Sequence, residues 1–516
     1  MTESSNVAEV LYQNIAAGRE NKVAVCCRGA RFTYGDMVQL SGRAGNALKS
    51  LGVEREQRVA LLLPDGPELI ASFYGAAAIG AVPVPLNTYL LAEDYETLFN
   101  QSRAKVVVVG KAFAYLLEPI RSRCVHLRHV VVVGEGSWPS AVAWDDWIQA
   151  ASPELRPVEV SPDEPAFWLY SSGSTGRLKA VIHVHRSVRF TCEQYAGGVL
   201  ALRETDRCFS AAKLFHAYGL GNGMTFPFWA GGTSVLWPDQ VLAETLFEVI
   251  RRFQPTVFFA TPALFVSMLA LSNPERRNNL GSVRFCVSAG EALPGSTFQR
   301  WQEQFGLEIV DGIGSTEMLH IFISNRPGQS VAGSSGSIVP GYRVKLVNDN
   351  GDPARPGEPG DLWVSGASSA IGYWQDRART QATMVGEWVL TGDKYRRDAH
   401  GCFWYQGRSD DMLKVNGVWV SPIEVENVLT QHAAVRECAV VGVRNTGELL
   451  QIKAFVVLAQ GVEPSPALAR QLQNFVRQRA PQRYPQVLEF VAALPKTASG
   501  KVRRFELRAA EAGAVR

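Results

Sequence analysis

The segment Thr245-Leu-Phe-Glu-Val-Ile-Arg-Arg-Phe253-Gln-Pro-Thr256-Val-Phe-Phe-Ala260 combines the two patterns that decide the fold. Its first half repeats apolar residues at helical spacing, and its second half is a short apolar run rich in β-formers. Similar apolar runs start at Arg58, Lys105, His129 and Val283. Short apolar runs that alternate with helices are typical of parallel strands covered on both faces. The sequence therefore predicts an α/β fold.

An uncharged stretch from Leu69 to Leu86 is long enough to be mistaken for a membrane-spanning helix. Gly80 and the two prolines that follow it would break such a helix. We therefore predict a helix to about Ile79 and a short buried strand after it.

The length of 516 residues exceeds what one hydrophobic core usually supports, so more than one domain is expected. After residue 330, Gly and Pro punctuation such as Gly351-Asp-Pro-Ala-Arg-Pro-Gly-Glu-Pro-Gly360 predicts twisted antiparallel strands, which we expect to form a distorted β-barrel-like part of the large domain. The last hundred residues are predicted to form a small α+β domain. We place the boundary in the polar stretch Gly407-Arg-Ser-Asp-Asp411, giving a large domain of residues 1–409 and a small one of residues 410–516.

Composition and charge argue against several classes of protein. Hydrophobic residues make up 46% and charged residues 20%, which is typical of a globular chain. The net charge is only +3 and no long run of Lys and Arg occurs, so nucleic acid is not expected as a partner. The eight cysteines are scattered without a CxxC pair, and the first residues lack an export signal. We therefore expect reduced thiols and a cytoplasmic protein.

The strongest motif is Tyr170-Ser-Ser-Gly-Ser-Thr-Gly-Arg-Leu-Lys179, which follows an apolar run. Its small residues let backbone N–H groups and hydroxyls approach an oxyanion closely, and its Lys supplies a cation for polyphosphate. The spacing differs from GxxxxGK[ST], so mononucleotide-switch ATPases are not indicated. The motif predicts a phosphate-binding loop, and a flexible surface loop is the alternative.

Three weaker motifs follow. Asp311-Gly-Ile-Gly-Ser-Thr-Glu317 places a carboxylate beside a hydroxyl, which suits magnesium bound to phosphate oxygens. Asp393 can accept hydrogen bonds from ribose hydroxyls, and Arg408 can hold a phosphate or ribose edge. Pro495-Lys-Thr-Ala-Ser-Gly-Lys501 is a cationic loop near the end of the chain. Taken singly, each motif also fits a plain turn or a solvated tail.

Together and in this order, the four motifs resemble the adenylate-forming superfamily of acyl-CoA synthetases, peptide-synthetase adenylation domains and luciferases. The resemblance covers nearly the whole chain. It is closest to the benzoate-CoA ligase branch, through Ala217-Tyr-Gly-Leu-Gly-Asn222 with Phe226-Pro227 and through Asp311-Gly-Ile-Gly-Ser-Thr-Glu-Met-Leu-His-Ile321. In the second segment Ile313 stands where most of the superfamily has Tyr.

The resemblance implies a site for ATP and magnesium. The β- and γ-phosphates would be held by Ser171, Ser172, Gly173, Ser174, Thr175, Gly176 and Lys179. The adenine slot would be formed by Ala289, Gly290, Glu291, Asp311, Gly312 and Ile313. Thr316 would contact phosphate, Glu317 would help to bind magnesium, Asp393 would hold the ribose, and Arg408 would lie beside the ribose and phosphate.

Lys501 matches the Lys that, in this superfamily, reaches over from a mobile small domain to the substrate carboxylate and the α-phosphate. A fixed cation at that position stabilises the charge that develops when two anions react. Lys501, Glu317 and Thr316 are therefore the catalytic candidates. For thioester formation, the resemblance implies rotation about a hinge at Asp410, so that the loop Lys414-Val-Asn-Gly417 lines a tunnel for coenzyme A.

The acyl pocket implied by the benzoate branch comprises His216, Ala217, Tyr218, Gly314, His320 and Ile321. Ala217 and Gly314 would leave a flat slot, and Tyr218 offers an aromatic face to a planar ring. His216 stands where benzoate ligases tend to carry Phe. Its ring could hydrogen-bond an amino or hydroxyl substituent, or it could act as a gate.

The sequence thus predicts an AMP-forming aryl-CoA ligase that converts an aromatic carboxylate and ATP to acyl-AMP and pyrophosphate, and then forms a thioester with coenzyme A. Benzoate and a substituted benzoate such as anthranilate (2-aminobenzoate) are the expected acids. The alternative is a stand-alone adenylation enzyme that loads an aryl acid onto a carrier protein. A non-catalytic relative is disfavoured, because all the charged motif residues are retained. The superfamily often forms dimers, so a homodimer is also expected, without a membrane partner.

Overall fold

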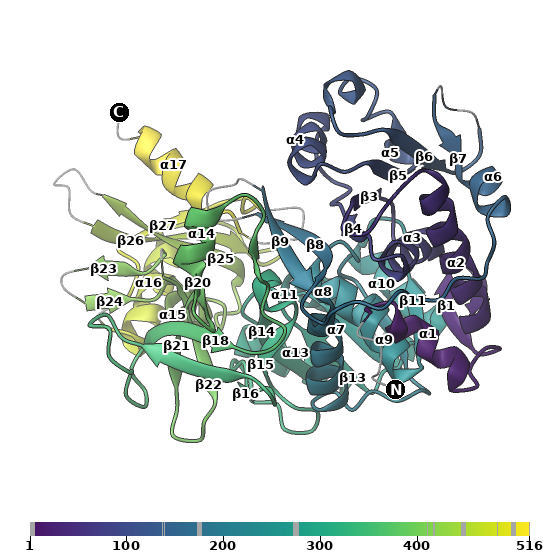
Figure 1. The fold of residues 1–516 in the computed structure, drawn as a ribbon. Helices are drawn as coiled ribbons and strands as arrows, with labels where there is room; N and C mark the ends of the chain where they lie inside the picture. Colours follow the sequence, from purple (N-terminus) through teal and green to yellow (C-terminus); the bar gives the residue numbers. More distant parts are fainter. Residues whose placement is uncertain are drawn as a thin grey trace.

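The computed structural model describes residues 6–136, 138, 140–172, 178–271, 278–409, 411–415, 418–444, 450–481, 483–496 and 502–514 (Figure 1). Its longest sheet has the order β16 (Ser337–Ile338), β15 (Ile321–Ser324), β14 (Ile309–Gly314), β13 (Phe285–Ser288), β12 (Val257–Ala260), β10 (Arg207–Ser210), β11 (Thr233–Leu236), β1 (Val23–Cys27) and β2 (Ala30–Thr33). The strands from β14 to β1 are parallel, and β15, β16 and β2 add antiparallel edges. The predicted strands at residues 256–260 and 283–287 are thus confirmed.

A second, parallel sheet has the order β4 (Val82–Pro85), β3 (Arg58–Leu62), β5 (Val106–Gly110), β6 (His129–Val133) and β7 (Val142–Ala143). The valine runs of β5 and β6 are largely buried, because helices cover both faces of the sheet. The uncharged stretch forms α3 (Pro67–Ala78) and then β4, as predicted. In the described part of the chain, no helix is long and apolar enough to cross a membrane.

Helices fill the space around these two sheets. They are α1 (Glu9–Ala16), α2 (Tyr34–Ser50), α4 (Ala92–Ser102), α5 (Lys111–Ala114), α6 (Trp144–Gln149), α7 (His185–Thr191), α10 (Ala243–Phe253), α11 (Pro262–Leu271) and α13 (Gly295–Phe305). α10 matches the helical spacing read from the sequence, and its apolar face is buried. α2 and α3 approach closely at two glycines, where a Cβ on Gly45 would lie 2.7 Å from the Gly75 carbonyl oxygen.

Antiparallel strands join the two sheets to the rest of the chain. β8 (Pro165–Ser172) and β9 (Leu178–Val184) form a hairpin that β19 (Gly372–Tyr373) extends. A further antiparallel sheet contains β17 (Arg343–Val347), β18 (Gly360–Ser365), β20 (Met384–Val385), β21 (Trp388–Arg397) and β22 (Phe403–Arg408), with α14 (Arg377–Thr383) beside it. This sheet confirms the antiparallel strands predicted after residue 330.

The C-terminal elements gather at one end of the molecule (Figure 1). They are β23 (Leu413–Val415), β24 (Val418–Val420), α15 (Pro422–Leu429), β25 (Val435–Arg444), β26 (Leu450–Leu458), α16 (Pro466–Arg479), β27 (Val487–Phe490) and α17 (Arg504–Ala514). Their buried side chains form two apolar clusters that use only residues from Leu413 onward. The largest cluster of the molecule uses only buried residues up to Phe403.

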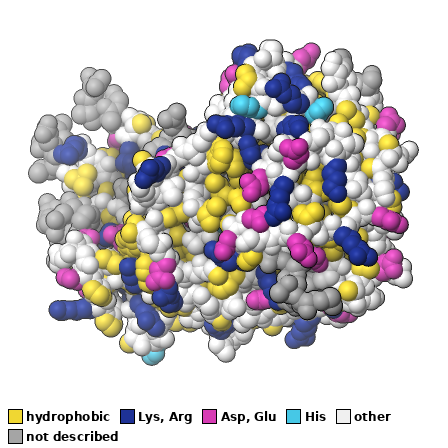
Figure 2. Space-filling view, viewed as in Figure 1, with side chains coloured by type: hydrophobic (Ala, Val, Ile, Leu, Met, Phe, Trp, Pro, Cys, Tyr) yellow, Lys and Arg dark blue, Asp and Glu magenta, His cyan; other side chains and the backbone are white. Residues whose placement is uncertain are grey.

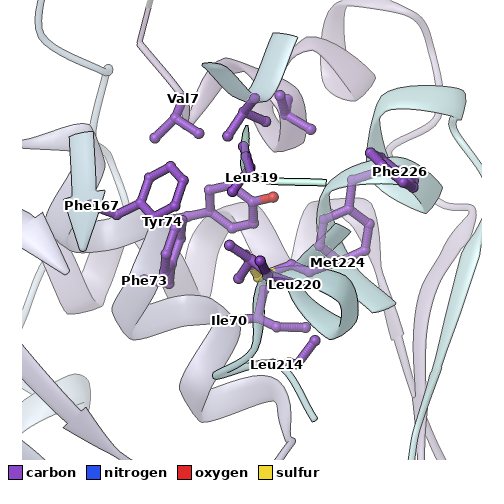
Figure 3. Close-up of a cluster of buried hydrophobic side chains, with 14 of the residues drawn as sticks. Val7, Ile70, Phe73, Tyr74, Phe167, Leu214, Leu220, Met224, Phe226 and Leu319 are labelled. Atoms are coloured by element: carbon purple, nitrogen blue, oxygen red, sulfur yellow. The ribbon is translucent and has the colours of Figure 1, made fainter. Parts of the chain in front are cut away.

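Part of that largest cluster is shown in Figure 3, where side chains of α3 meet those of a helical segment between residues 217 and 230. Phe73 and Tyr74 from α3 approach Leu220, Met224 and Phe226 in an apolar environment. On the outer face seen in Figure 2, acidic and basic side chains are interspersed around smaller apolar areas.

Candidate active site

The predicted site residues converge where parallel strands of the longest sheet end. β12 ends at Ala260, β13 at Ser288 and β14 at Gly314, and all three carboxyl ends lie at the same edge because the strands are parallel neighbours. Ligands of open α/β sheets bind outside this edge. The β8–β9 hairpin brings the phosphate-loop motif to the same region, as the contacts of Lys179 show.

Lys179 and Glu317 form an ion pair in which the Lys179 Nζ lies 2.8 Å from Glu317 Oε1. The Tyr373 hydroxyl donates to the same oxygen at 2.8 Å, and Lys179 Nζ also lies 4.5 Å from the centre of the Tyr373 ring. Burial opposes ionisation of Glu317, but the charge of Lys179 and these hydrogen bonds outweigh it and lower the pKa of the carboxyl. The ion pair between Lys179 and Glu317 therefore joins the phosphate-loop motif to the Asp311–Glu317 motif.

The turn that carries Glu317, η5 (Thr316–Met318), is anchored from two sides. His183 Nε2 donates to the Thr316 carbonyl oxygen at 2.8 Å, and Ser368 Oγ donates to the Met318 carbonyl oxygen at 2.8 Å. His183 is fully buried, and its burial lowers its pKa to about 4. The imidazole is therefore neutral near pH 7 and acts as a fixed hydrogen-bond donor to the turn.

The residue that follows this turn has an unusual backbone conformation. Leu319 has φ +65° and ψ −39°, and the His320 amide donates to the Met318 carbonyl oxygen at 2.8 Å, which closes a γ-turn. A side chain other than glycine in this region costs on the order of 1–3 kcal/mol. The γ-turn redirects the chain into β15 and places the His320 ring in the interior.

The predicted adenine residues lie together because β13 and β14 pair Ser288 with Asp311. Ala289, Gly290 and Glu291 follow β13, and Asp311, Gly312 and Ile313 lie within β14. The Asp311 carboxyl is buried, and its Oδ1 has no hydrogen-bond partner among the described residues. Burial raises the pKa of this carboxyl well above its ordinary value. An unpartnered buried oxygen of this kind can accept a hydrogen bond from a ligand.

Asp393 and Arg408 face each other on neighbouring strands, β21 and β22. Arg408 Nη1 lies 3.2 Å from Asp393 Oδ1 and donates to the Thr391 carbonyl oxygen at 3.0 Å. Gly392 has φ +75°, and a Cβ there would lie 2.6 Å from Arg408 Nη2. The left-handed backbone favours glycine at this position of β21, and the absent side chain leaves room for the Arg408 guanidinium beside Asp393.

Tyr218 and His320 form the predicted aromatic wall. Their ring centres are 5.6 Å apart with 35° between the planes, and the rings of Tyr195 and Phe226 pack on His320 at 5.2 and 4.5 Å. Burial lowers the pKa of His320 to about 3, so its ring is neutral near pH 7. The Tyr218 hydroxyl donates to the Val287 carbonyl oxygen at 3.0 Å, which fixes the ring against β13.

The remaining acyl-pocket residues lie on the same elements. Ala217 and Tyr218 belong to α8 (Ala217–Leu220), His216 precedes it, and Ile321 opens β15. Ala217 and Ile321 are buried, and the His216 ring packs 4.5 Å from the ring of Phe215.

Gly314 lies where two strands approach closely. A Cβ there would lie 2.5 Å from the His320 carbonyl oxygen and 2.8 Å from the Ile321 amide nitrogen. The absent side chain therefore gives room to the backbone of β15, which pairs with β14 at a register shift. The place of Gly314 in the acyl slot stays a prediction.

Several predicted residues cannot be placed in this geometry. Gly173, Ser174, Thr175, Gly176, Asp410, Gly417 and Lys501 lie outside the described residues, as do the side chains of Ser172 and Lys414. Ser171 is described, and its buried Oγ has no hydrogen-bond partner among the described residues. A ligand oxygen could accept a hydrogen bond from this hydroxyl.

Sequence reasoning missed Tyr373 and His183 as parts of the site. Tyr373 lies 56 residues after Glu317, and no motif spacing links the two. Its position follows from the pairing of β19 with β9, which places Tyr373 beside Val181 on the strand that carries Lys179. His183 belongs to none of the four motifs, and only its contact with the Thr316 carbonyl oxygen identifies it as a buried donor.

The fold and these clusters define an α/β enzyme built to hold a phosphate-bearing ligand beside an aromatic pocket. The chain belongs to the AMP-binding enzyme family: residues 12–374 match the AMP-binding enzyme model, and residues 424–501 match the AMP-binding enzyme C-terminal domain.

Individual relatives and solved structures resemble the chain over almost its whole length. Benzoate–CoA ligase of Thauera aromatica is 44% identical over 512 residues, which are 98% of this chain and 96% of that protein. The crystal structure of the anthranilate CoA ligase AuaEII in complex with anthranoyl-AMP superposes with a TM-score of 0.95 at 40% identity and covers 100% of this chain and 98% of that one. A benzoate CoA ligase from Burkholderia xenovorans LB400 gives a TM-score of 0.89 at 42% identity, covering 98% and 99%.

Proposed function

We propose that this protein is an AMP-forming aryl-CoA ligase: an aromatic carboxylate attacks the α-phosphate of ATP to give acyl-AMP and pyrophosphate, and the thiol of coenzyme A then displaces AMP. The observation that carries the proposal is the position of the Tyr218–His320 wall. His320 lies three residues after Glu317, so the γ-turn at Leu319 joins the aromatic pocket directly to the anchored phosphate-site turn. The similarity to benzoate and anthranilate ligases supports the same function.

In this proposal Lys179 and the Ser171–Gly176 loop would hold the β- and γ-phosphates. Thr316 would contact phosphate, and Glu317 would help to bind a magnesium ion, which would supply positive charge to neutralise the phosphates. The residues fit such an ion, because Lys179 and Tyr373 both bond Glu317 Oε1 and favour the ionised carboxylate that a hard cation prefers. A single carboxylate oxygen together with phosphate oxygens and water is a common arrangement for magnesium.

The nucleoside is proposed to lie between two sets of residues. Adenine would lie against residues 289–291 and 311–313, with its amino group bonded to the unpartnered Asp311 oxygen. Asp393 would accept from the ribose hydroxyls, with Arg408 beside the ribose and phosphate. Burial, and to a smaller extent Asp393 and Asp311, raise the pKa of Tyr395 well above its ordinary value, so both carboxyls lie near the same buried side chain.

Lys501 is proposed to stabilise the charge that develops between the attacking carboxylate and the α-phosphate. Lys501 lies on the C-terminal side of the hinge candidate Asp410. It would therefore reach the site by rotation of a domain of residues 410–516. Contacts on the two sides of Asp410 support this division. Ser409 Oγ donates to Asp361 of the large domain at 2.6 Å, whereas Arg508 of α17 donates to Asp411 at 2.5 Å. After rotation, Lys414 and Gly417 would line the coenzyme A tunnel.

The acyl group is proposed to be benzoate or a substituted benzoate such as anthranilate. Tyr218 would lie against the ring, with Ala217, His320 and Ile321 around it and His216 at the edge of the pocket. The His320 ring is neutral near pH 7, so the Tyr218–His320 wall supplies no cation. An uncharged aromatic ring therefore fits this wall better than a ring that carries a second carboxylate.

The test is a pyrophosphate-release assay with ATP and magnesium, using benzoate, anthranilate, hydroxybenzoates, cinnamates and medium-chain fatty acids, each with and without coenzyme A. Aryl-CoA identified by mass is the expected product. Adenylate without thioester in the presence of coenzyme A would instead favour loading of a carrier protein. Turnover confined to fatty acids would overturn the aromatic assignment.

Two further properties of the proposed enzyme are its location and its assembly. A cytoplasmic location is supported by the eight cysteines, all of which are free thiols. A homodimer is the expected assembly, and the molar mass from light scattering would distinguish it from a monomer.

A further inference from the structure

The segment behind the aromatic wall contains a buried polar side chain that no part of the proposed mechanism uses. Asn222 is completely buried, yet neither its Oδ1 nor its Nδ2 has a hydrogen-bond partner among the described residues. A buried amide without partners is costly, because it has lost its hydrogen bonds to water without replacement. Such groups are rare in native structures and point to a ligand or an ordered water.

Asn222 lies in a distorted stretch of helix. The segment consists of α8, the π-helical turn η3 (Gly221–Thr225) and α9 (Phe226–Ala230). π-helical turns inside helices are frequent at functional sites, because they shift the side chains that follow out of the regular spacing. On the same segment Leu220 and Met224 point into the apolar cluster with Phe73 and Tyr74 (Figure 3).

Asn222 lies next to one residue of the acyl-pocket wall. Its amide is close to the Tyr218 hydroxyl, which is bonded to the Val287 carbonyl oxygen, but neither amide atom reaches hydrogen-bond geometry with a described partner. Its neighbour Gly221 leaves room for the His320 ring, because a Cβ on Gly221 would lie 2.5 Å from His320 Cδ2. Neither ring nitrogen of His320 has a hydrogen-bond partner in the described part of the chain. The buried side chains of Asn222 and His320, both without a described hydrogen-bond partner, therefore lie beside the Tyr218 ring.

We propose that Asn222 is a specificity residue which, with His320, binds a neutral hydrogen-bonding substituent on the ring of the acyl group. The inference rests on the proposed aryl-CoA ligase function. An amide offers both donors and an acceptor, and a neutral imidazole offers one of each, so an amino or hydroxyl group can bond both. A charged substituent is not matched, because neither partner carries a charge.

The experiment compares Asn222→Leu with the wild-type enzyme, measuring kcat/KM for aryl-CoA formation from benzoate, anthranilate, 2-, 3- and 4-hydroxybenzoate and phthalate. We expect at least one amino- or hydroxybenzoate to be favoured over benzoate and phthalate by the wild-type enzyme. Asn222→Leu should lower that preference about tenfold or more, because a buried hydrogen bond to the substrate is lost.

Asn14→Leu is the matched control. Asn14 is equally buried, but its Nδ2 donates to the carbonyl oxygens of Phe228, Val10 and Leu11 at 2.9–3.1 Å. The melting temperature should therefore fall for Asn14→Leu and be unchanged or higher for Asn222→Leu in the absence of substrate. The substrate preference should be unchanged in Asn14→Leu.

The outcomes separate the two claims. An unchanged ratio between substituted acids and benzoate in Asn222→Leu, in an enzyme that makes aryl-CoA, would overturn the role of Asn222 and leave an ordered water as its partner. Absence of aryl-CoA from every acid in the wild-type enzyme would overturn the proposed function itself. If Asn222→Leu does not fold, Asn222→Ser removes the amide with less bulk, and the same loss of preference is expected.

Discussion

Lys179 Nζ and Glu317 Oε1 are 2.8 Å apart, although 138 residues separate them in the chain. Only 16% of the Lys179 side chain and 12% of the Glu317 side chain are exposed. The pair joins the phosphate-loop hairpin to the turn beside the aromatic pocket. A ligand phosphate would compete with Glu317 for the ammonium group, and a metal ion would compete with Lys179 for the carboxylate. The pair therefore favours the ionised Glu317 carboxylate and holds both side chains in position before a ligand binds.

Lys179→Met and Glu317→Gln are each expected to lower the rate of acyl-adenylate formation about a hundredfold, because the first removes a cation from the phosphates and the second removes an anionic ligand of the proposed magnesium ion. Their effects should be less than additive in the double variant, since the two residues contact each other. The measurement is ATP–pyrophosphate exchange with the preferred acid. Additive losses would contradict coupling through the pair. The exposed pair Arg343–Glu387 is the control. Its disruption should leave the exchange rate unchanged and should change the free energy of unfolding by no more than about 1 kcal/mol.

Lys501→Ala should impair the two half-reactions unequally. Adenylate formation should fall about a hundredfold or more, because a cation at the reacting phosphate is lost. Thioester formation from chemically prepared acyl-AMP should be affected much less, since the proposed rotation removes Lys501 from the site. Rapid-quench measurements of each step would test this. Equal losses in both steps would contradict the assignment of Lys501 to the first step alone.

Asp393→Asn should raise KM for ATP about tenfold, since one charge-assisted hydrogen bond contributes roughly 1.5–3 kcal/mol. Wild-type enzyme should discriminate against deoxy-ATP, and the variant should discriminate less. The preference among aromatic acids should not change. Asp352→Asn, at an exposed turn, is the control. A KM for ATP that stays constant while acid preference changes would place Asp393 elsewhere in the site.

His183 makes folding stability depend on pH in a defined direction. Its pKa is lowered to about 4 by burial, whereas an unfolded chain has the ordinary value of about 6.5. Below pH 6.5 the unfolded state binds a proton that the folded state does not, so the folded state loses stability as pH falls towards 4. The total is about 3 kcal/mol.

Urea unfolding between pH 4 and pH 8 would measure this effect. His183→Gln keeps a donor for the Thr316 carbonyl but cannot titrate, so its stability should fall less steeply in acid. His126→Gln replaces an exposed histidine and should leave the slope unchanged. If the free energy of unfolding falls equally steeply with pH in wild type and His183→Gln, burial of His183 does not cause the loss of stability in acid.

Gly314→Ala is expected to destabilise the fold by about 1–3 kcal/mol, because the added methyl group meets the backbone of His320 and Ile321. Gly295→Ala is the control: its Cβ would meet only atoms at 3.6 Å or more, in the first turn of α13. Thermal unfolding of the two variants measures the difference. If Gly314→Ala is as stable as wild type and only rejects larger acids, Gly314 shapes the acyl pocket and not the packing of β14 on β15.

The local elements were predictable because their signals are short-range. The apolar runs of β3, β5, β6, β12 and β13, the helix α10 and the break between α3 and β4 follow from side-chain period and from the properties of Gly and Pro. The phosphate loop and the Asp311–Glu317 segment could be recognised for the same reason, since each motif is continuous in the chain.

The tertiary structure decided which distant residues meet. Tyr373 joins the Lys179–Glu317 pair because β19 pairs with β9, and His183 supports Thr316 because the hairpin crosses the end of the longest sheet. Gly314 leaves room for the close approach of β14 and β15, and Asn222, in a π-helical turn, is buried without a hydrogen-bond partner among the described residues. Strand order, register and helix distortion set these positions through contacts between segments far apart in sequence. The sequence by itself therefore determined the elements and the continuous motifs, and only packing decided how their side chains converge on one site.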